Sequence, residues 1–297
     1  MIEKKERYYY IYYFVLYISF GLFFPYVNAY YNRIGLNGKE IGFIASTSVI
    51  IAMIFVPFWG YLADRYSKKG VLSFLFIFTI ISVFLWKLQT QFIYICLVSM
   101  LVSVFKSDLS SISDSITVSY CEKSKLEFGT IRVFGSLGYI VGSTFISGLL
   151  SYLGYNGPFV VIYILSLVVS LTILFQLPQY HSTKNKDHNK ISYKTILSNK
   201  VYLFVVSFSL LSILVVDTLM AYSGIHLVNS LNSSEAYIGV YVFMMVIPEL
   251  FIVRYASRII KKIGYYQAYI ISALSVILRC LICYLTSNVY VFLLAQS

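Results

Sequence analysis

Long apolar runs separated by short polar segments are the feature that most constrains the fold of this chain. Of its 297 residues, 59% are hydrophobic and only 12% are charged, about half the charged fraction of an ordinary soluble domain. Runs of about 20 apolar residues suit transmembrane helices, whereas barrel strands need only about 10. Every backbone polar group in lipid must be paired within the structure, which such helices achieve. The sequence therefore predicts an all-α membrane protein with many spans.

Nine full transmembrane helices and the start of a tenth are predicted. The basic N-terminus continues into a long span without a small-residue cleavage site, which favours a first transmembrane helix over a removed signal peptide. The tenth stretch is too short to cross about 30 Å of hydrocarbon, so we expect a product truncated at its C-terminus. The spans are residues 8–31, 41–61, 70–86, 92–118, 131–152, 158–177, 201–225, 237–256 and 265–286, and the tenth starts at 289.

The net charge of +11 is distributed very unevenly between the loops. Sixteen Lys and Arg residues fall in alternate loops counted from the N-terminus, and three (Arg33, Lys39 and Lys87) fall on the opposite side. Because basic residues concentrate in cytoplasmic loops, this bias places the N-terminus in the cytoplasm. The charge is thus explained by membrane orientation, and a nucleic-acid partner is not needed.

One long polar segment, residues 178–200, divides the spans into two groups. We predict an N-terminal six-helix bundle over 1–177, a cytoplasmic linker over 178–200 and an incomplete C-terminal bundle over 201–297. An internal repeat supports this division, because two corresponding spans end in the same basic pattern 193 residues apart, as expected for parallel repeats. The matching residues are Arg65, Lys68 and Lys69 in the first half and Arg258, Lys261 and Lys262 in the second.

The cytoplasmic end of the second span carries the pattern G-x-x-x-D-R-x-x-K-K, formed by Gly60, Asp64, Arg65, Lys68 and Lys69. Glycine allows helices to approach closely, the aspartate can cap or pair at a neighbouring helix end, and the basic residues suit lipid headgroups. The pattern resembles the loop signature of the major facilitator superfamily. Ser67 departs from it, since the family usually has glycine there. The alternative, an ordinary basic loop, explains the lysines but not Gly60 with Asp64.

Two opposite charges lie on consecutive predicted helices, Asp114 in the fourth span and Arg132 in the fifth. Ionisable groups at bilayer depth are costly and often mark a path for a solute or an ion. Arg132, Ser136 and Tyr139 share one helix face by their spacing. A guanidinium and a carboxylate suit the hydroxyl or carboxylate groups of a solute, and a tyrosine adds a flat apolar surface. The alternative is that Arg132 extends to the headgroups and Asp114 only balances its charge.

This stretch, FGTIRVFGSLGY, resembles the lactose permease and 3-phenylpropionic acid transporter groups. The resemblance implies that Arg132 binds the solute together with Asp114, eighteen residues earlier, and that Tyr139 stacks on a sugar ring. This chain differs from the permease at two of these positions: Asp114 stands where the permease has glutamate, and Tyr139 stands where it has tryptophan. The resemblance also implies two six-helix bundles around a central cavity.

A second pair of charges lies in the eighth and ninth spans, Glu249 and Arg279. The sequence from Glu249 to Arg279 resembles the same groups, and the resemblance implies that Glu249 couples solute to proton movement with help from Arg279. A structural ion pair between the two helices is the alternative. The roles of Lys106, Asp108 and Asp217 stay open: Lys106 and Asp108 are two residues apart and cannot face each other on a helix.

The predicted function is proton-coupled symport of a small polar organic solute, an oligosaccharide or an aromatic acid. No P-loop, hydrolase or metalloprotease motif is present, so we expect no enzymatic activity, cofactor or metal. The predicted partners are the solute, protons and the lipid bilayer, for a monomer in a bacterial cytoplasmic membrane. The alternatives are an exporter with the same fold and a truncated product without transport activity.

Overall fold

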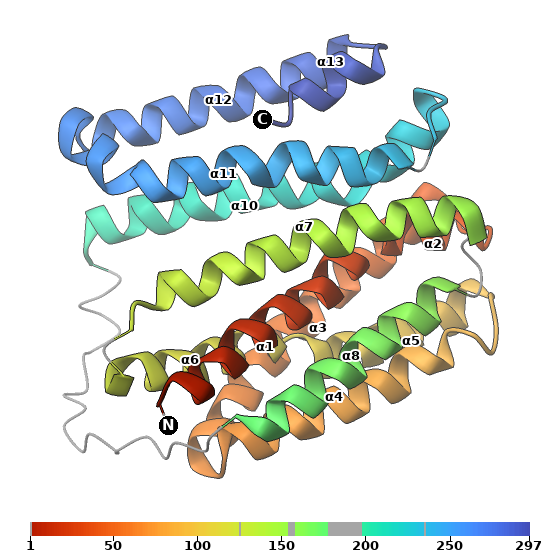
Figure 1. Cartoon of the computed structure of the whole chain (residues 1–297). Coiled ribbons are helices and arrows are strands. Elements are labelled where there is room, and N and C mark those ends of the chain that lie inside the picture. Colours follow the sequence, from red (N-terminus) through yellow and green to blue (C-terminus); the bar gives the residue numbers. More distant parts are fainter. Residues whose placement is uncertain (1, 125, 154–157, 178–197, 235) are drawn as a thin grey trace. The chain divides into compact units, whose positions relative to one another are not determined.

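The computed structural model describes residues 2–124, 126–153, 158–177, 198–234 and 236–297, and its regular elements in these ranges are all helical (Figure 1). The helices before the polar segment are α1 (Ile2–Phe23), α2 (Val27–Arg33), α3 (Gly38–Arg65), α4 (Lys68–Leu85), α5 (Phe92–Lys106), α6 (Leu109–Ser124), α7 (Phe128–Leu153) and α8 (Pro158–Gln176). After it come α10 (Lys200–Ile225), the π-helical turn η1 (His226–Ser230), α11 (Ala236–Ile263), α12 (Tyr265–Leu285) and α13 (Val289–Leu294).

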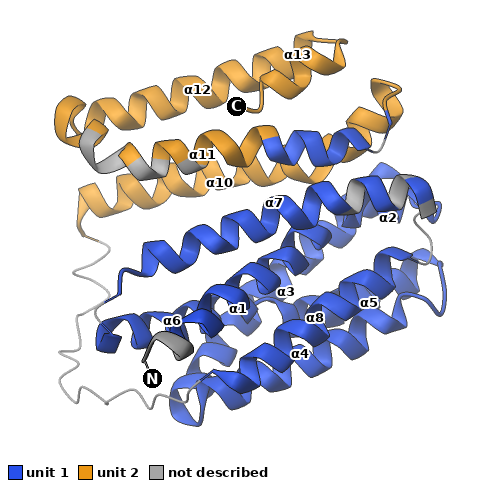
Figure 2. Cartoon of the chain, in the orientation of Figure 1, with its two compact units in different colours: residues 1–181, 234–243 blue, residues 182–233, 244–297 orange. Residues whose placement is uncertain are grey.

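Contacts divide the chain into two compact units, which Figure 2 colours separately. Unit 1 comprises Met1–His181 and Ser234–Phe243, and unit 2 comprises Ser182–Ser233 and Met244–Ser297. Most of the predicted linker, residues 178–197, lies outside the described residues. The predicted bundle boundaries at 177 and 201 therefore stay a prediction.

Seven helical segments in the described part of the chain are long and apolar enough to cross a membrane. They agree with an all-α protein of many spans. Neither α7 nor α11 is among the seven, so the count of nine spans and the start of a tenth stays a prediction. The seven segments are Glu6–Arg33, Gly38–Arg65, Lys68–Leu85, Phe92–Ser124, Pro158–Gln176, Lys200–Ser230 and Tyr265–Leu285.

Two of these segments are interrupted where the sequence predicts continuous helices. The first is broken after Phe23 by a turn that contains Pro25, which has no backbone N–H with which to continue the helical hydrogen bonds. The fourth is broken at Ser107 and Asp108, between α5 and α6. The interruption places Lys106 at the last position of α5.

The second span starts earlier than predicted because of its N-terminal cap. The Asn37 side chain accepts hydrogen bonds from the backbone N–H groups of Lys39 and Glu40, both at 3.0 Å, and Glu40 accepts one from the Asn37 N–H at 2.8 Å. This reciprocal capping box pairs N–H groups that would otherwise lack a partner at the helix start. It fixes the beginning of α3 at Gly38.

The core of unit 1 is organised around α1, which packs along α7 and also contacts α8. A Cβ atom on Gly138 would collide with the backbone of Phe14, and one on Gly142 would collide with the backbone of Ile18. The converse holds at Gly21 of α1, where a Cβ would meet the backbone of Tyr139. Glycines on both helices therefore allow the two backbones to touch, as small residues do in membrane interfaces.

We predict that Gly138→Ala destabilises the protein, because the new methyl group must push α7 away from the Phe14 carbonyl. The expected loss is about 1–3 kcal/mol, the usual cost of overpacking a filled interface. Thermal unfolding of the detergent-solubilised protein measures it. Gly129→Ala is the matched control, since nothing lies within 4 Å of its added Cβ. Equal melting temperatures for the two variants would contradict the close contact.

Candidate functional site

The predicted site residue Asp114 is held by a tyrosine of α1. Asp114 lies half-buried on α6, and the Tyr13 hydroxyl donates a hydrogen bond of 2.6 Å to its Oδ1 atom. The neighbouring residues pair in the same way, since the Tyr12 hydroxyl and the Ser113 hydroxyl lie 2.7 Å apart. Hydrogen bonds to an ionised carboxylate are stronger than those between neutral groups. Two consecutive tyrosines of α1 thus fix the position of Asp114.

Arg132 lies on α7 and contacts the next turn of the same α1 face. Its guanidinium carbon is 4.3 Å from the centre of the Tyr17 ring, within the range of a cation–π interaction. Gly135, three residues later, makes room for this ring, because a Cβ there would lie 2.9 Å from Tyr17 Cδ2. Arg132 itself is exposed. The arginine is therefore placed over an aromatic face that α1 and α7 build together.

The two charged residues are connected through α1 rather than directly. Among the described residues no ion pair joins Asp114 and Arg132. Instead, the rings of Tyr13 and Tyr17 stack with their centres 5.8 Å apart, so the path from carboxylate to guanidinium runs through two tyrosines. Neither tyrosine is among the predicted site residues. The signal available was their spacing of four residues, which puts them on one face of the first helix.

The other two predicted solute-binding residues lie on α7 with Arg132. Ser136 and Tyr139 are both half-buried, and the helix over Phe128–Leu153 confirms the spacing that puts them on one face with Arg132. Whether they contact a solute stays a prediction.

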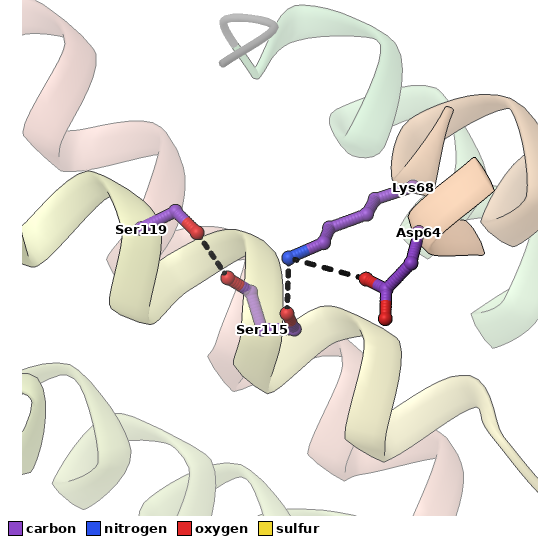
Figure 3. A network of polar contacts seen from close by, with 4 residues as sticks. All are labelled: Asp64, Lys68, Ser115 and Ser119. Carbon is purple, nitrogen blue, oxygen red and sulfur yellow. Dashed lines mark hydrogen bonds and ion pairs between the residues drawn. The ribbon is translucent and has the colours of Figure 1, made fainter. Parts of the chain in front are cut away.

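The loop pattern at the end of the second span forms a polar network between three helices, part of which Figure 3 shows. Lys68 Nζ lies 3.9 Å from Asp64 Oδ1 and donates a hydrogen bond of 2.6 Å to Ser115 Oγ on α6. The Ser119 hydroxyl extends the network with a 2.8 Å bond to the Ser115 carbonyl. Lys68 thus connects the α3–α4 corner to the helix that carries Asp114.

The remaining residues of the pattern have contacts within the protein, and their anchoring at lipid headgroups stays a prediction. Lys69 Nζ donates to the carbonyls of Phe175 and Leu177, at 2.8 and 2.6 Å, which lie at the C-terminal end of α8 and favour a cation. Arg65 Nη1 donates to the Tyr61 hydroxyl at 3.0 Å. Gly60 faces Asp108, whose Oδ2 would lie 4.0 Å from an added Cβ.

Ser67 has a structural role where the family pattern usually has glycine. Its hydroxyl accepts a hydrogen bond of 3.2 Å from the Gly70 N–H and so caps the start of α4. Serine is among the preferred residues at this position of a helix. The departure from the pattern therefore stabilises the turn.

The predicted proton-coupling residues Glu249 and Arg279 both belong to unit 2 and are not paired with each other. Arg279 donates from Nε and Nη2 to Gln296 Oε1, at 3.0 and 2.5 Å. The Gln296 amide in turn donates to the Phe292 carbonyl at 2.7 Å. Glu249 is exposed on α11. The ion pair considered as an alternative is not present among the described residues, and Gln296 was missed because glutamine carries no charge.

Two further acidic residues have contrasting surroundings. Asp108 is buried, with 2% of its surface exposed, at the break between α5 and α6. Asp217 lies exposed on α10. Neither belongs to the arrangement of Asp114 and Arg132 around α1.

The chain is similar to a protein family and to several known proteins. A family model described as "MFS_1 like family" matches residues 7–297. The uncharacterized transporter YwbF of Bacillus subtilis is 28% identical over 260 residues, covering 85% of this chain and 63% of YwbF. The chain therefore spans about three fifths of that relative's length. The maltose permease of Geobacillus stearothermophilus is 24% identical, covering 89% of this chain and 67% of the permease.

The chain is also similar to two more distant relatives and to a solved structure. The quinolone resistance protein NorA of Staphylococcus aureus is 24% identical over 66% of this chain and 53% of its own length. A probable 3-phenylpropionic acid transporter of Escherichia coli is 21% identical over 59% of this chain and 45% of its own length. The crystal structure of the nucleoside transporter NupG (D323A mutant) matches with a TM-score of 0.82 and 17% identity, covering 97% of this chain and 77% of NupG. This likeness shows a shared fold.

We predict that Tyr13 and Asp114 are energetically coupled. In a double-mutant cycle of Tyr13→Phe and Asp114→Asn, the expected coupling is about 1.5–3 kcal/mol, the usual value for a hydrogen bond to a charged group. Thermal unfolding of the four proteins measures it. The matched control is Tyr12→Phe with Asp114→Asn, because Tyr12 bonds to Ser113 instead. Strict additivity in the Tyr13 cycle would contradict the hydrogen bond.

Proposed function

The chain belongs to the MFS_1 like family, and its relatives are membrane transporters rather than enzymes; from this premise we propose that it is a proton-coupled symporter of a small polar organic solute. Membership of this family, the fold shared with NupG and seven helical segments long and apolar enough to cross a membrane, counted in the described part of the chain, support a role in transport. Symport, the direction of transport and the class of solute are parts of the proposal that the candidate site supports.

The placement of Arg132 over Tyr17 carries the proposal. An arginine that served only as a headgroup anchor would extend along the apolar surface to the lipid interface. Arg132 instead lies on a ring whose exposed fraction is 9%, one turn from the tyrosine that holds Asp114. A forked donor and a carboxylate acceptor on neighbouring faces suit a solute with hydroxyl or carboxylate groups.

Ser136 and Tyr139 extend the proposed solute site along α7. Ser136 adds a hydroxyl that can both donate and accept a hydrogen bond. Tyr139 offers a ring on which the apolar face of a sugar or an aromatic acid can stack. The maltose permease and the probable 3-phenylpropionic acid transporter among the relatives support these two solute classes.

Proton coupling is assigned to Glu249, with Arg279 as the residue that influences it. A carboxyl group can take up and release a proton, whereas an arginine keeps its charge and can only change the energy of its neighbours. The hydrogen bonds to Gln296 hold the Arg279 side chain in one direction. In the proposed cycle the solute site opens first to one side of the membrane and then to the other side, where the solute is released.

The proposed setting is a bacterial cytoplasmic membrane, with the N-terminus in the cytoplasm and the protein working as a monomer. The excess of basic residues in alternate loops supports this orientation. On this orientation the network of Asp64, Lys68 and Ser115 lies on the cytoplasmic side.

Export is the second candidate function. The similarity to the quinolone resistance protein NorA favours it, because that relative is named for resistance. The Arg132 and Asp114 arrangement suits a bound solute in either direction, so the direction must come from a flux measurement.

We predict that Arg132→Ala abolishes solute uptake and leaves membrane insertion intact, because it removes the only forked donor of the proposed site. Uptake of a radiolabelled solute by cells expressing the transporter with this sequence measures the effect, and membrane immunoblots measure insertion. Arg33→Ala is the control, since Arg33 is an exposed arginine at the end of α2. Undiminished uptake by the Arg132→Ala variant would overturn the site assignment.

We predict that the solute moves into the cell together with protons that flow down their gradient. In right-side-out vesicles, an outside-acid gradient is expected to drive solute accumulation, and a protonophore is expected to abolish it. Glu249→Gln should lose this accumulation and keep exchange of labelled for unlabelled solute. Accumulation only in inverted vesicles with an acidic interior would favour export instead.

A further inference from the structure

A row of four aromatic rings starts at Tyr13 in the proposed solute site, runs along α1 and ends at Phe24, the first residue of the turn after this helix. Neighbouring ring centres are 5.8 Å apart for Tyr13 and Tyr17, 5.2 Å for Tyr17 and Phe20, and 5.9 Å for Phe20 and Phe24. Residues spaced by three or four positions share one helix face, so the rings form a continuous aromatic row. Asp114 and Arg132 contact its first two rings.

Lys106 occupies the far end of this aromatic row. Its Nζ atom is 3.9 Å from the centre of the Phe23 ring and 4.0 Å from that of Phe24. Ring faces attract a cation, but they accept none of the three hydrogen bonds that an ammonium group donates in the usual way. In the described part of the chain, Lys106 has no hydrogen bond and no carboxylate within ion-pair distance. A charge at bilayer depth normally has such a partner.

Asp108 is the carboxylate nearest to Lys106 in the sequence, and it is directed elsewhere. Its Oδ2 atom lies toward Gly60 of α3, and the side chain is buried. Arg132 is accompanied by the carboxylate of Asp114 across two stacked rings. Lys106 is therefore the cation of the aromatic row that has no such carboxylate.

We propose that Lys106, held between Phe23 and Phe24, binds the carboxylate of the transported solute, so that the transporter takes an elongated organic anion rather than a neutral sugar. Seven residues separate Tyr17 from Phe24, about 10 Å along a helix. A ring-bearing monocarboxylate of that length can reach Lys106 at one end and Arg132 and Asp114 at the other. Phe24, with 43% of its surface exposed, offers a face to the solute's body. This inference rests on the proposed function and names its solute class.

Matched pairs of probes test the inference on the purified protein: 3-phenylpropionate against 3-phenylpropionamide, and maltobionate against maltose. Titration calorimetry gives the dissociation constants for the wild type, Lys106→Met and Lys106→Arg. Lys106→Met should weaken binding of a carboxylate probe about 10- to 100-fold, the factor for losing a hydrogen bond to a charged group, and leave the neutral partner unchanged. Lys106→Arg should keep the preference for the carboxylate. Lys87→Met, the loss of an exposed lysine in a loop, should change nothing.

The possible failures are distinguishable. Equal weakening of acid and amide by Lys106→Met, or no weakening of either, would overturn the role of Lys106. A third result is that Arg132→Ala loses all binding while the wild type shows no preference for acids over neutral probes. This result would support the proposed solute site and would contradict the inference that the solute is an anion. Failure of every probe to bind the wild type would overturn the solute site and this inference together. Binding of the amide by Lys106→Met shows that the variant is folded.

Discussion

The close approach of α1 and α7 is the constraint on which the candidate site depends. Gly138 and Gly142 let the α7 backbone touch Phe14 and Ile18 of α1, and no residue with a Cβ fits this contact without a shift. Gly135, one helical turn before Gly138, leaves room for the Tyr17 ring in the same interface. Since residues three apart lie on one helix face, Arg132 is brought over that ring. The glycine contact therefore decides where the arginine points.

Both charged residues of the candidate site contact neutral aromatic side chains. Asp114 accepts a hydrogen bond from a tyrosine hydroxyl, and Arg132 lies on a tyrosine face. If the two side chains formed a direct ion pair, a solute that bound to either of them would first have to separate the two charges. Less free energy is lost when a polar solute replaces a contact with a hydroxyl or a ring face. In the proposed function, this arrangement therefore favours reversible binding of the solute.

The sequence predicted the charged residues of the site and not their contacts. The cost of charge at bilayer depth identified Asp114 and Arg132, and the spacing along one helix identified the face that Arg132 shares with Ser136 and Tyr139. The bond from Tyr13 to Asp114 joins residues 101 positions apart, so it depends on how α1 packs and has no local signal. The same limit applies to Lys69, whose hydrogen bonds to the end of α8 join residues more than 100 positions apart. It also explains Gln296, an uncharged partner of Arg279 that a search for charges passes over.

Three consecutive residues of α6 join the loop network to the proposed solute site. Ser113 and Asp114 are bound by Tyr12 and Tyr13 of α1, and Ser115 is bound by Lys68 of α4. The contacts of the α3–α4 corner and those of the proposed solute site therefore meet on the same turn of α6. If the proposed change of access moves this corner, the displacement reaches Asp114 through the α6 backbone and needs no ion pair between Asp114 and Arg132.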